Sequence, residues 1–432
     1  MQAYELKDSG VDWLGSIPIH WGIDRLKDVS HLRDEKTATK SSDEDYLELE
    51  DLSQWTGKIL NKRNTLEVAS QVNIFYEGDV LFGKLRPYLA KYAYVDFNGK
   101  CTGEILAIEP TRIYGGFLAY YVGSKHFINH CDNFSYGAKM PRINWNTQMG
   151  IFPIPIPPLF EEQKAIADYL DQACQSIDKT ITLKQQQLDK LDAYRKSVIH
   201  EAVTKGLDKT VAMKDSGVKW LGEIPDHWKF ITLKSAVSKT NSGVTPKGGS
   251  ESYVDEGIPL IRSQNVKFSG LDLSDVVFIT EETHYKMANS KVHIGDVLLN
   301  ITGASLGRCA FVANIGEANV NQHVCILRPY PWIKTEFLYY LLLSEVGQAQ
   351  IFSSFTGSGR EGLNFEVIKN FKLPLPEKQE QISLVNYLND FCQRLDKTKE
   401  AISQQIKTLT QYRQSLIHEC VTGKKRVYQA TH

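Results

Sequence analysis

The chain contains the same short sequence twice. Residues 7–21 read KDSGVDWLGSIPIHW, and residues 214–228 read KDSGVKWLGEIPDHW, 207 positions later. Two longer segments, 161–204 and 379–422, begin EEQKAIADYLD and QEQISLVNYLN and end AYRKSVIHEAVT and QYRQSLIHECVT, 218 positions apart. A chain of 432 residues with this repeat is expected to fold as two related halves, each with a short motif, a variable region and a long repeated segment.

The long repeated segments carry the pattern of helices with one apolar stripe. The stripe of the first consists of Ile166, Leu170, Ile177, Leu188, Leu191, Val198 and Ala202, and that of the second of Leu384, Leu388, Leu395, Ile406, Leu409, Leu416 and Cys420. Each segment follows a Pro-rich stretch, has no internal Pro and ends at Gly206 or Gly423, as helices do. A helix of about 45 residues is roughly 65–70 Å long. Because one apolar stripe needs a partner, we expect the two helices to pair in a coiled coil.

The variable regions have the pattern of mixed α/β domains. Short β-like runs end in Gly-containing turns and precede helical stretches at 115–124 and 335–351; the runs are 79–82, 91–97, 104–110, 296–301, 309–313 and 323–329. The predicted domains are a first variable domain at 1–159, a first long helix at 160–206, a second variable domain at 207–376, a second long helix at 377–423 and a tail at 424–432. The two variable regions share this order of elements but little sequence.

Composition narrows the class of protein. Hydrophobic residues make up 42% and charged residues 23%, which is typical of a packed globular chain. No apolar run approaches the ~20 residues that span a bilayer, and the first residues do not resemble a signal peptide, so we expect a cytoplasmic protein. The seven cysteines form no C-x-x-C pair, and we expect reduced thiols.

Charge is balanced overall but not locally. Lys+Arg 50 against Asp+Glu 51 excludes a protein that holds nucleic acid by bulk charge. Residues 82–91 nevertheless carry Lys84, Arg86 and Lys91 without an acid, and residues 238–250 carry Lys239 and Lys247 without an acid. Such loops can place cations and backbone N–H groups along phosphates. Two variable domains joined by paired helices are suited to reading two sites on one extended ligand, and duplex DNA is the leading candidate.

Further loops carry side chains that can read base edges. In the second half these are Thr302, Ser305, Arg308, Asn321, Gln322, His323, Arg360 and Asn364, and in the first half Lys139, Arg142 and Asn144. Arg and Lys can pair with guanine, and Asn and Gln with adenine, with ~1–3 kcal/mol of discrimination for each good bidentate pair. We therefore predict that these loops contact bases.

Several short motifs match part of an enzyme signature, but none is complete. Gly357, Gly359 and Gly362 fit G-x-G-x-x-G, but no dinucleotide-binding βαβ unit follows. The pairs at 200–201 and 418–419 lack the second His of H-E-x-x-H, and neither His323 with Cys325 nor His130 with Cys131 has further metal ligands at suitable spacing. No P-loop or nucleophile–base constellation is present. We expect a binding protein with no catalytic residue and no metal.

The combined motifs resemble the specificity subunit of type I restriction-modification systems. The resemblance rests on the repeated opening, SGVTP at 242–246, GDVLLNITGASLGR followed by NVNQHV, the LPLPE helix entry and the YR-x-S-[VL]-I-H-E helix ends. It implies an α/β (mixed α+β) fold with two target-recognition domains, separated by two long antiparallel helices that form a coiled coil, in an internal pseudo-twofold repeat. Each domain would read one half of a bipartite DNA site, and the helices would set the spacer.

The resemblance also implies partners. These are two modification subunits, which bind S-adenosylmethionine and methylate adenine, and restriction subunits, which use ATP and Mg; this chain would hold no cofactor. One departure limits it: the first half has FGKLRPYLAKYA and CTGEILAIEP where the second has NITGASLGRCA and NVNQHVCILRP, so the roles of Thr302, Arg308 and Gln322 are not carried over to the first domain. Three alternatives stay open: the specificity subunit of a related methyltransferase/nuclease with a bipartite site, a coiled-coil scaffold that does not read DNA, and an enzyme with an unrecognised site.

Overall fold

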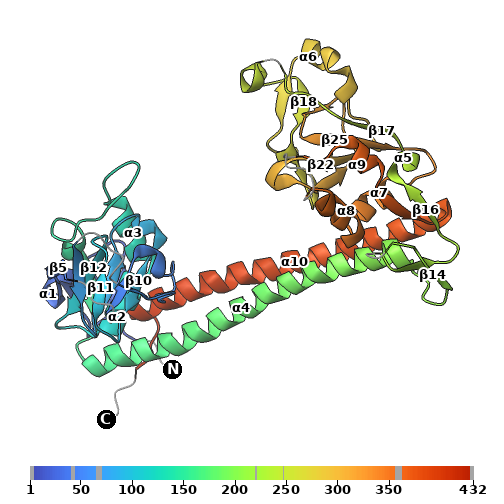
Figure 1. Ribbon diagram of the computed structural model, residues 1–432. Helices are drawn as coiled ribbons and strands as arrows, with labels where there is room; N and C mark the ends of the chain where they lie inside the picture. The colour runs from blue at the N-terminus through green and yellow to red at the C-terminus, as the bar shows by residue number, and fades with distance from the viewer. Residues whose placement is uncertain are drawn as a thin grey trace. The chain divides into compact units, whose positions relative to one another are not determined.

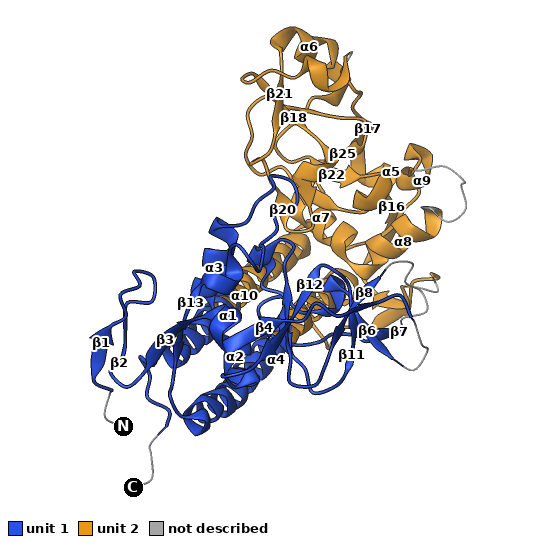
Figure 2. Cartoon of the chain, turned by 90° about the vertical axis from the view of Figure 1, so that its left-hand side faces the viewer, with its two compact units in different colours: residues 1–185, 403–432 blue, residues 186–402 orange. Residues whose placement is uncertain are grey.

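The computed structural model describes residues 4–39, 44–64, 71–218, 221–246, 248–355 and 362–428. It divides into two compact units, Met1–Gln185 with Ser403–His432, and Gln186–Ile402 (Figure 2). The domain boundaries predicted above give each long helix a segment of its own, whereas each compact unit contains part of both helices.

The first unit is built around two sheets. Its elements are β1 (Leu6–Asp8), β2 (Ser16–Pro18), β3 (Gly22–Arg25), α1 (Leu26–Val29), β4 (Ser30–Leu32), β5 (Lys36–Thr37), β6 (Asp45–Leu47), β7 (Arg63–Asn64), β8 (Val72–Phe75), β9 (Val80–Gly83), β10 (Tyr92–Tyr94), β11 (Gly99–Cys101), β12 (Ile105–Pro110), α2 (Gly115–Val122), α3 (Lys125–Asn133), β13 (Pro153–Ile156), the first part of α4 (Phe160–Lys205) and the last part of α10 (Lys378–Val421) (Figure 1). One sheet has the order β10-β9-β12-β4 and the other β5-β8-β11-β6-β7.

Alternation along the central strands of this unit creates two cores. Val80 and Phe82 of β9 pack with α2, α3 and the long helices, while Leu81 between them packs toward the second sheet. Leu106 and Ala107 of β12 divide in the same way. A strand with apolar residues on both faces must be covered twice, so the layers run helices, sheet, sheet.

The second unit repeats this plan. Its elements are the last part of α4, β14 (Met213–Asp215), β15 (Glu223–Pro225), β16 (Lys229–Thr232), α5 (Leu233–Ala236), β17 (Val237–Ser242), β18 (Ile258–Ile261), β19 (Val266–Lys267), β20 (Gly270–Leu271), β21 (Val277–Ile279), α6 (Glu281–Lys286), β22 (Val297–Asn300), β23 (Cys309–Phe311), β24 (Asn319–Val320), β25 (Val324–Pro329), α7 (Thr335–Leu343), α8 (Glu345–Phe355), α9 (Phe365–Lys369), β26 (Lys372–Leu375) and the first part of α10 (Lys378–Val421). The sheet β23-β22-β25-β17 has the topology of β10-β9-β12-β4. The parallel pair β18–β24 likewise matches the parallel pair β6–β11.

The long helices pair within each unit. In the first unit, Lys184 donates to Gln405 (Nζ–Oε1 2.6 Å) and Arg413 pairs with Asp178 (Nε–Oδ1 3.0 Å). In the second unit, Arg195 pairs with Asp396 (Nη1–Oδ1 2.8 Å). Residue numbers rise on α4 as those of their partners fall on α10, so the predicted antiparallel pairing is confirmed. Both helices stop where the sequence predicts, because Gly206 and Gly423 adopt φ of +74° and +71°, the left-handed cap that favours glycine.

The short repeated motif packs against the start of the long helix that follows it in each unit. In the first unit the carboxylate of Glu162 is buried and accepts hydrogen bonds from Trp21 Nε1 (3.1 Å) and the Tyr4 hydroxyl (2.7 Å). In the second unit the equivalent Glu380 pairs with His227 (Nε2–Oε2 3.0 Å). The short motif therefore contacts the start of the long helix in both units.

The seven cysteines are free thiols, as predicted, and all seven are buried. Within the described ranges, none of the helices is both long enough and apolar enough to cross a membrane.

Candidate nucleic-acid interface

Three of the predicted base-reading loops of the second unit meet at one junction. The first follows β22, the second precedes β25 and the third precedes α9. The amide of Ile301 donates to the carbonyl of His323 (3.0 Å), and the amide of Leu363 donates to the carbonyl of Ile301 (2.9 Å). We name this set of backbone contacts the second junction.

A chain of polar side chains lies on the second junction. Thr302 Oγ1 is 2.6 Å from His323 Nδ1, and Gln322 Nε2 is 2.9 Å from His323 Nε2. When the Gln322 amide donates a hydrogen bond to His323 Nε2, the imidazole proton is on Nδ1, and Nδ1 donates a hydrogen bond to Thr302 Oγ1. The Gln322 Oε1 atom is buried without a hydrogen-bond partner among the described residues. This arrangement holds His323 and Gln322 in fixed orientations beside a free acceptor.

Other predicted contact residues serve the backbone of their own loops. The Asn321 side chain, which is 9% exposed, accepts from the amide of His323 (3.1 Å). The Asn364 side chain caps α9 by accepting from the amide of Glu366 (2.9 Å). The Ser305 hydroxyl donates to the carbonyl of Thr302 (3.3 Å). These three side chains shape the loops.

A fourth loop packs on the second junction through Gly243. Its amide donates to the carbonyl of Asn321 (3.1 Å), and a Cβ at this position would lie 1.7 Å from the carbonyl oxygen of Val320. Only glycine permits this approach, which brings the SGVTP loop beside the others.

The cations of the second unit are placed less uniformly. Arg308 is half-buried, and its guanidinium has no ion pair or hydrogen bond within the part of the chain that the structure describes. Lys239 lies on β17 opposite Arg328, and partial burial together with Arg328 lowers its pKa. Lys247 and Arg360 lie outside the described residues.

The first unit builds the same junction from different residues. The amide of Lys84 donates to the carbonyl of Glu104 (3.0 Å), and the amide of Ile143 donates to the carbonyl of Lys84 (3.1 Å). Lys84, Glu104 and Ile143 thus occupy the positions of Ile301, His323 and Leu363. This first junction lies at the ends of β9 and β12, as the second lies at the ends of β22 and β25.

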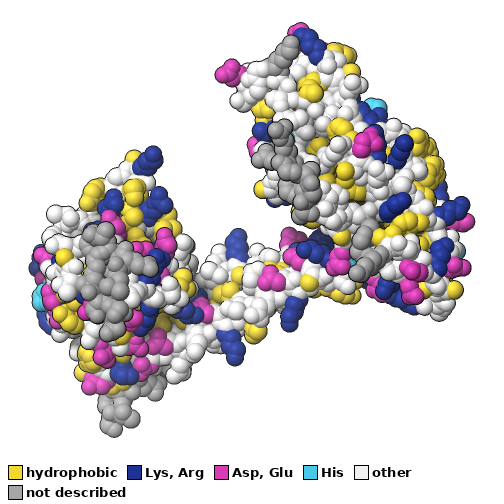
Figure 3. Space-filling view, viewed as in Figure 1, with side chains coloured by type: hydrophobic (Ala, Val, Ile, Leu, Met, Phe, Trp, Pro, Cys, Tyr) yellow, Lys and Arg dark blue, Asp and Glu magenta, His cyan; other side chains and the backbone are white. Residues whose placement is uncertain are grey.

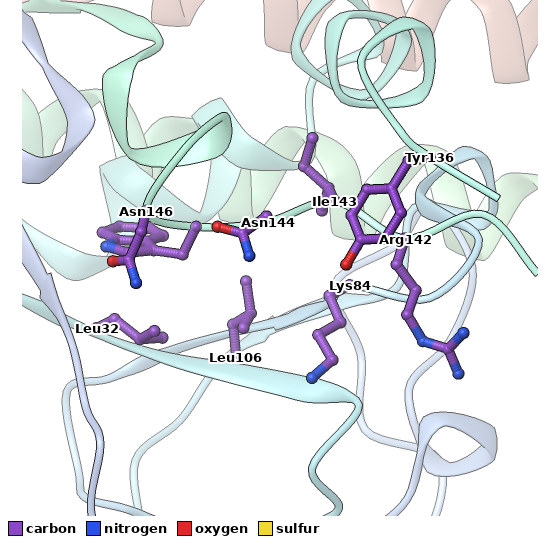
Figure 4. A pocket seen from close by; sticks show the side chains of 9 residues that line it. Leu32, Lys84, Leu106, Tyr136, Arg142, Ile143, Asn144 and Asn146 are labelled. Atoms are coloured by element: carbon purple, nitrogen blue, oxygen red, sulfur yellow. The ribbon is translucent and has the colours of Figure 1, made fainter.

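Lys84 and Ile143 of the first junction line a hollow of about 190 Å³. Figure 4 shows Asn144 and Asn146 on one side of it and Lys84 and Tyr136 on the other. A neighbouring hollow of about 450 Å³ shares Lys84 and adds Arg33, Lys36 and Asn73. Lys84 is therefore the cation common to both hollows, and its ammonium has no ion-pair partner among the described residues.

Arg142 is held by an acid that sequence reasoning missed. It forms a fork with Glu104 (Nε–Oε2 3.1 Å and Nη2–Oε1 3.1 Å), and these bonds raise its pKa. The stretch 82–91 contains no acid, but the fold brings Glu104 beside it from the turn that precedes β12. The acid in CTGEILAIEP was the available signal, and its position relative to Arg142 required the tertiary fold.

The remaining predicted residues of the first unit lie around this hollow. Arg86 is exposed and has φ +51°, and its amide donates to the carbonyl of Pro141 (2.7 Å). Lys139 is exposed on a loop that projects above α3, where Figure 3 shows Lys and Arg side chains among hydrophobic ones. The Asn144 side chain accepts from the amide of Thr147 (3.1 Å), so it also shapes its own loop.

Within the described ranges, no group of three or more His, Cys, Asp or Glu side chains is placed to hold a metal ion. His130 stacks on Trp13, and Cys131 is buried in the core of the first unit.

Comparison with known proteins agrees with the duplicated architecture. The family model described as "Type I restriction modification DNA specificity domain" matches residues 18–193 and 225–408. The EcoBI type I restriction enzyme specificity subunit of Escherichia coli is 28% identical over 63% of this chain. The MjaVIII type I restriction enzyme specificity subunit of Methanocaldococcus jannaschii is 27% identical over 63% of it. These matches cover 58% and 62% of the two relatives' own lengths.

A solved structure supports the fold. One chain of "Structural basis underlying complex assembly and conformational transition of the type I R-M system" aligns with a TM-score of 0.74 and 19% identity, covering 95% of this chain and 99% of that one. Since both halves match the family model, the chain belongs to the family of type I restriction modification DNA specificity proteins.

Proposed function

We propose that this chain is the DNA-recognition subunit of a type I restriction-modification complex. Each recognition domain reads one half of a bipartite DNA site through its junction. The single observation that carries this proposal is the duplicated junction: the same two backbone hydrogen bonds join the loops in both units, while Lys84 and Glu104 of the first unit stand where the second unit has Ile301 and His323. A shared frame with different side chains is what reading two different half-sites requires.

The residues of the two junctions support different contacts. In the second, Gln322, His323 and Thr302 offer donors and acceptors for base edges, and Arg308 offers a guanidinium that has no ion-pair partner among the described residues. In the first, Lys84 is available to a phosphate, and Asn146 and Tyr136 flank it. The continuity of α4 and α10 supports the further proposal that helix length sets the number of base pairs left unread between the half-sites.

The partners and cofactors follow from the same proposal. Two modification subunits would bind S-adenosylmethionine and methylate adenine, and restriction subunits would use ATP and Mg. This chain would supply recognition and no catalytic group.

Exchange of one domain tests the proposal. Residues 22–155 would be replaced by those of a relative with a different target, and methylated sites would be mapped in cells that carry the complete system. We expect one half-site to change, while the other half-site and the gap stay as they were, because the second domain and both helices are retained. A change at both half-sites, or methylation without sequence preference, would contradict the proposal.

A further inference from the structure

Strained backbone in the first unit is concentrated beside its junction. Among the described residues other than glycine, positive φ occurs at Trp55 (65°), Arg86 (51°) and Ala90 (47°). Left-handed backbone is unfavourable for residues with a Cβ and persists where surrounding contacts enforce it. All three residues belong to two neighbouring loops, 53–58 and 84–91.

Hydrogen bonds join these loops to each other and to the junction. The amide of Trp55 donates to the carbonyl of Ala90 (2.9 Å), and Gln54 forms a β-bridge with Lys91. At the other end of the loop 84–91, the amide of Arg86 donates to the carbonyl of Pro141. The loop that carries Lys84 and Arg86 is thus held on one side by the loop 53–58.

The loop 53–58 is held in turn by Arg413 of α10. The Arg413 guanidinium donates to the carbonyls of Trp55 (Nη1–O 2.8 Å) and Thr56 (Nη2–O 3.3 Å). Its Nε lies 3.0 Å from Asp178 of α4, and Lys58 reaches the same carboxylate (Nζ–Oδ2 2.8 Å). Arg413 is 5% exposed. One planar group therefore ties both long helices to two successive carbonyls, which a point charge such as lysine cannot do.

The second unit has the equivalent arginine without this contact. Arg195 and Asp396 stand 218 positions from Arg413 and Asp178 and form a similar pair (Nη2–Oδ2 2.9 Å). In this unit Arg195 and Ser269 instead line a hollow of about 400 Å³. No residue other than glycine has positive φ in the described part of the second unit. The hydrogen bonds from Arg413 to the carbonyls of Trp55 and Thr56 are therefore specific to the first unit, and pairing of the long helices does not require them.

We propose that Arg413 is a positioning residue for DNA reading by the first domain. It fixes the carbonyls of Trp55 and Thr56, and through Trp55 and Ala90 it sets the backbone of the loop that carries Lys84 and Arg86. This inference rests on the proposed function and deepens it, since it places control of one half-site in a side chain of the distant C-terminal repeat.

The matched variants Arg413→Lys and Arg195→Lys test the proposal. Lysine keeps a cation near the aspartate and so preserves helix pairing, but it loses the fork. The full chain, in complex with its modification subunits, would methylate a DNA library with both half-sites randomised. We expect Arg413→Lys to reduce base discrimination about tenfold at one half-site only, as loss of one good base contact would. Arg195→Lys should leave both half-sites unchanged.

Two further measurements keep the proposal falsifiable. Lys58→Met removes the more exposed cation of the same cluster and should shift the same half-site by a smaller factor, even if Arg413→Lys does not fold. Hydrogen exchange of the full chain without DNA should be faster at residues 84–91 in Arg413→Lys than in the wild type.

The outcomes separate this inference from the proposed function. Equal loss at both half-sites, or unchanged half-sites with unchanged exchange at 84–91, would overturn the role of Arg413. A wild-type complex that methylates without sequence preference would overturn the proposed function, while the exchange measurement would still decide whether Arg413 positions the loop.

Discussion

The two units support the same buried aspartate with arginines from different strands. Asp79 and Asp296 each follow a glycine in a turn before a central strand, β9 or β22, and each is almost fully buried. In the first unit Arg33, just after β4, pairs with Asp79 (Nε–Oδ2 2.6 Å). In the second unit Arg328, on β25, pairs with Asp296 (Nε–Oδ1 2.7 Å). The turn and its buried carboxylate are common to both units, whereas the arginine that pairs with the carboxylate comes from a different position in each unit.

The register shows how the two solutions are related. Glu109 of β12 lies opposite His31, as Arg328 of β25 lies opposite Lys239. Glu109 therefore occupies the place of Arg328, and it pairs with Arg33 (3.2 Å). Each unit thus pairs one arginine with its buried aspartate. In the first unit Glu109 forms a second ion pair with that arginine, Arg33.

Removing the arginine of one unit is expected to have the largest effect. Arg33→Asn leaves Asp79 buried without its counterion, which should cost about 3–5 kcal/mol of unfolding free energy. Burial already raises the pKa of Asp79 despite Arg33, so the variant should also favour a protonated carboxyl. Urea unfolding of the full chain measures the loss.

Transplanting the second unit's solution sharpens the comparison. Arg33→Asn combined with Glu109→Arg places the arginine where Arg328 stands, and we expect it to recover more than half of the lost stability. Glu109→Arg alone serves as the control, since two arginines would then compete for one carboxylate. A double variant no more stable than Arg33→Asn would show that the two strand positions are not interchangeable.

A second difference concerns the histidines that the long helices present to each unit. His418 of α10 stacks on His126 of α3 with ring centroids 3.8 Å apart. Burial, together with His126 and Lys424, lowers the pKa of His418 to about 4, and burial also lowers that of His126. In the second unit the equivalent His200 also has a lowered pKa from burial, but Val346 stands where His126 would be.

This difference predicts a pH dependence centred on the first unit. The folded state disfavours protonation of His418, so its stability is fully present above pH 6.5 and is lost as the pH falls toward about 4. The unfolding temperature of the full chain should fall over this window. His126→Phe keeps a ring in the stack and removes one of the two histidines, so its unfolding temperature should fall less. Equal pH dependence in the two proteins would assign the effect to other groups.

The fold could be predicted because its signals are local or repeated. The apolar runs at 79–82 and 296–301 have the length and composition of buried strands, and the structure places β9 and β22 there. The helix ends follow from Gly206 and Gly423, whose left-handed backbone is a property of the residue itself. The equivalence of Lys84 and Ile301 has no such signal, because it consists of backbone hydrogen bonds between loops far apart in sequence.

The candidate site was predicted at the level of loops and not of side chains. The loops near 301–308 and 319–324 do meet, because strands that are neighbours in a sheet bring their ends together. Asn321 and Asn364 are bound to their own backbone, which composition alone does not reveal. Arg142 is paired with Glu104, an acid from the turn before β12. Whether a polar side chain is available to DNA depends on such neighbours, and only the fold supplies them.

The smallest expected effect separates the two junctions by charge. Lys84 stands where the second unit has Ile301, so at this position only the first junction has an ammonium, and it has no ion-pair partner within the described ranges. Lys84→Ala should weaken binding to all DNA sequences alike and reduce the slope of log affinity against log salt by about 0.9, which corresponds to one phosphate contact. Fluorescence anisotropy with the full complex at several salt concentrations measures both quantities.

A variant of opposite sign tests the same assignment. Glu104→Gln removes the acid that neutralises Arg142 and should raise affinity and steepen the salt dependence, because a second cation becomes available to phosphates beside Lys84. If Lys84→Ala instead changed the preferred bases at one half-site while the salt slope stayed the same, Lys84 would be reading a base edge. The first junction would then recognise sequence with a cation at the position where the second junction has an aliphatic side chain, and the two halves would differ in how they read DNA as well as in what they read.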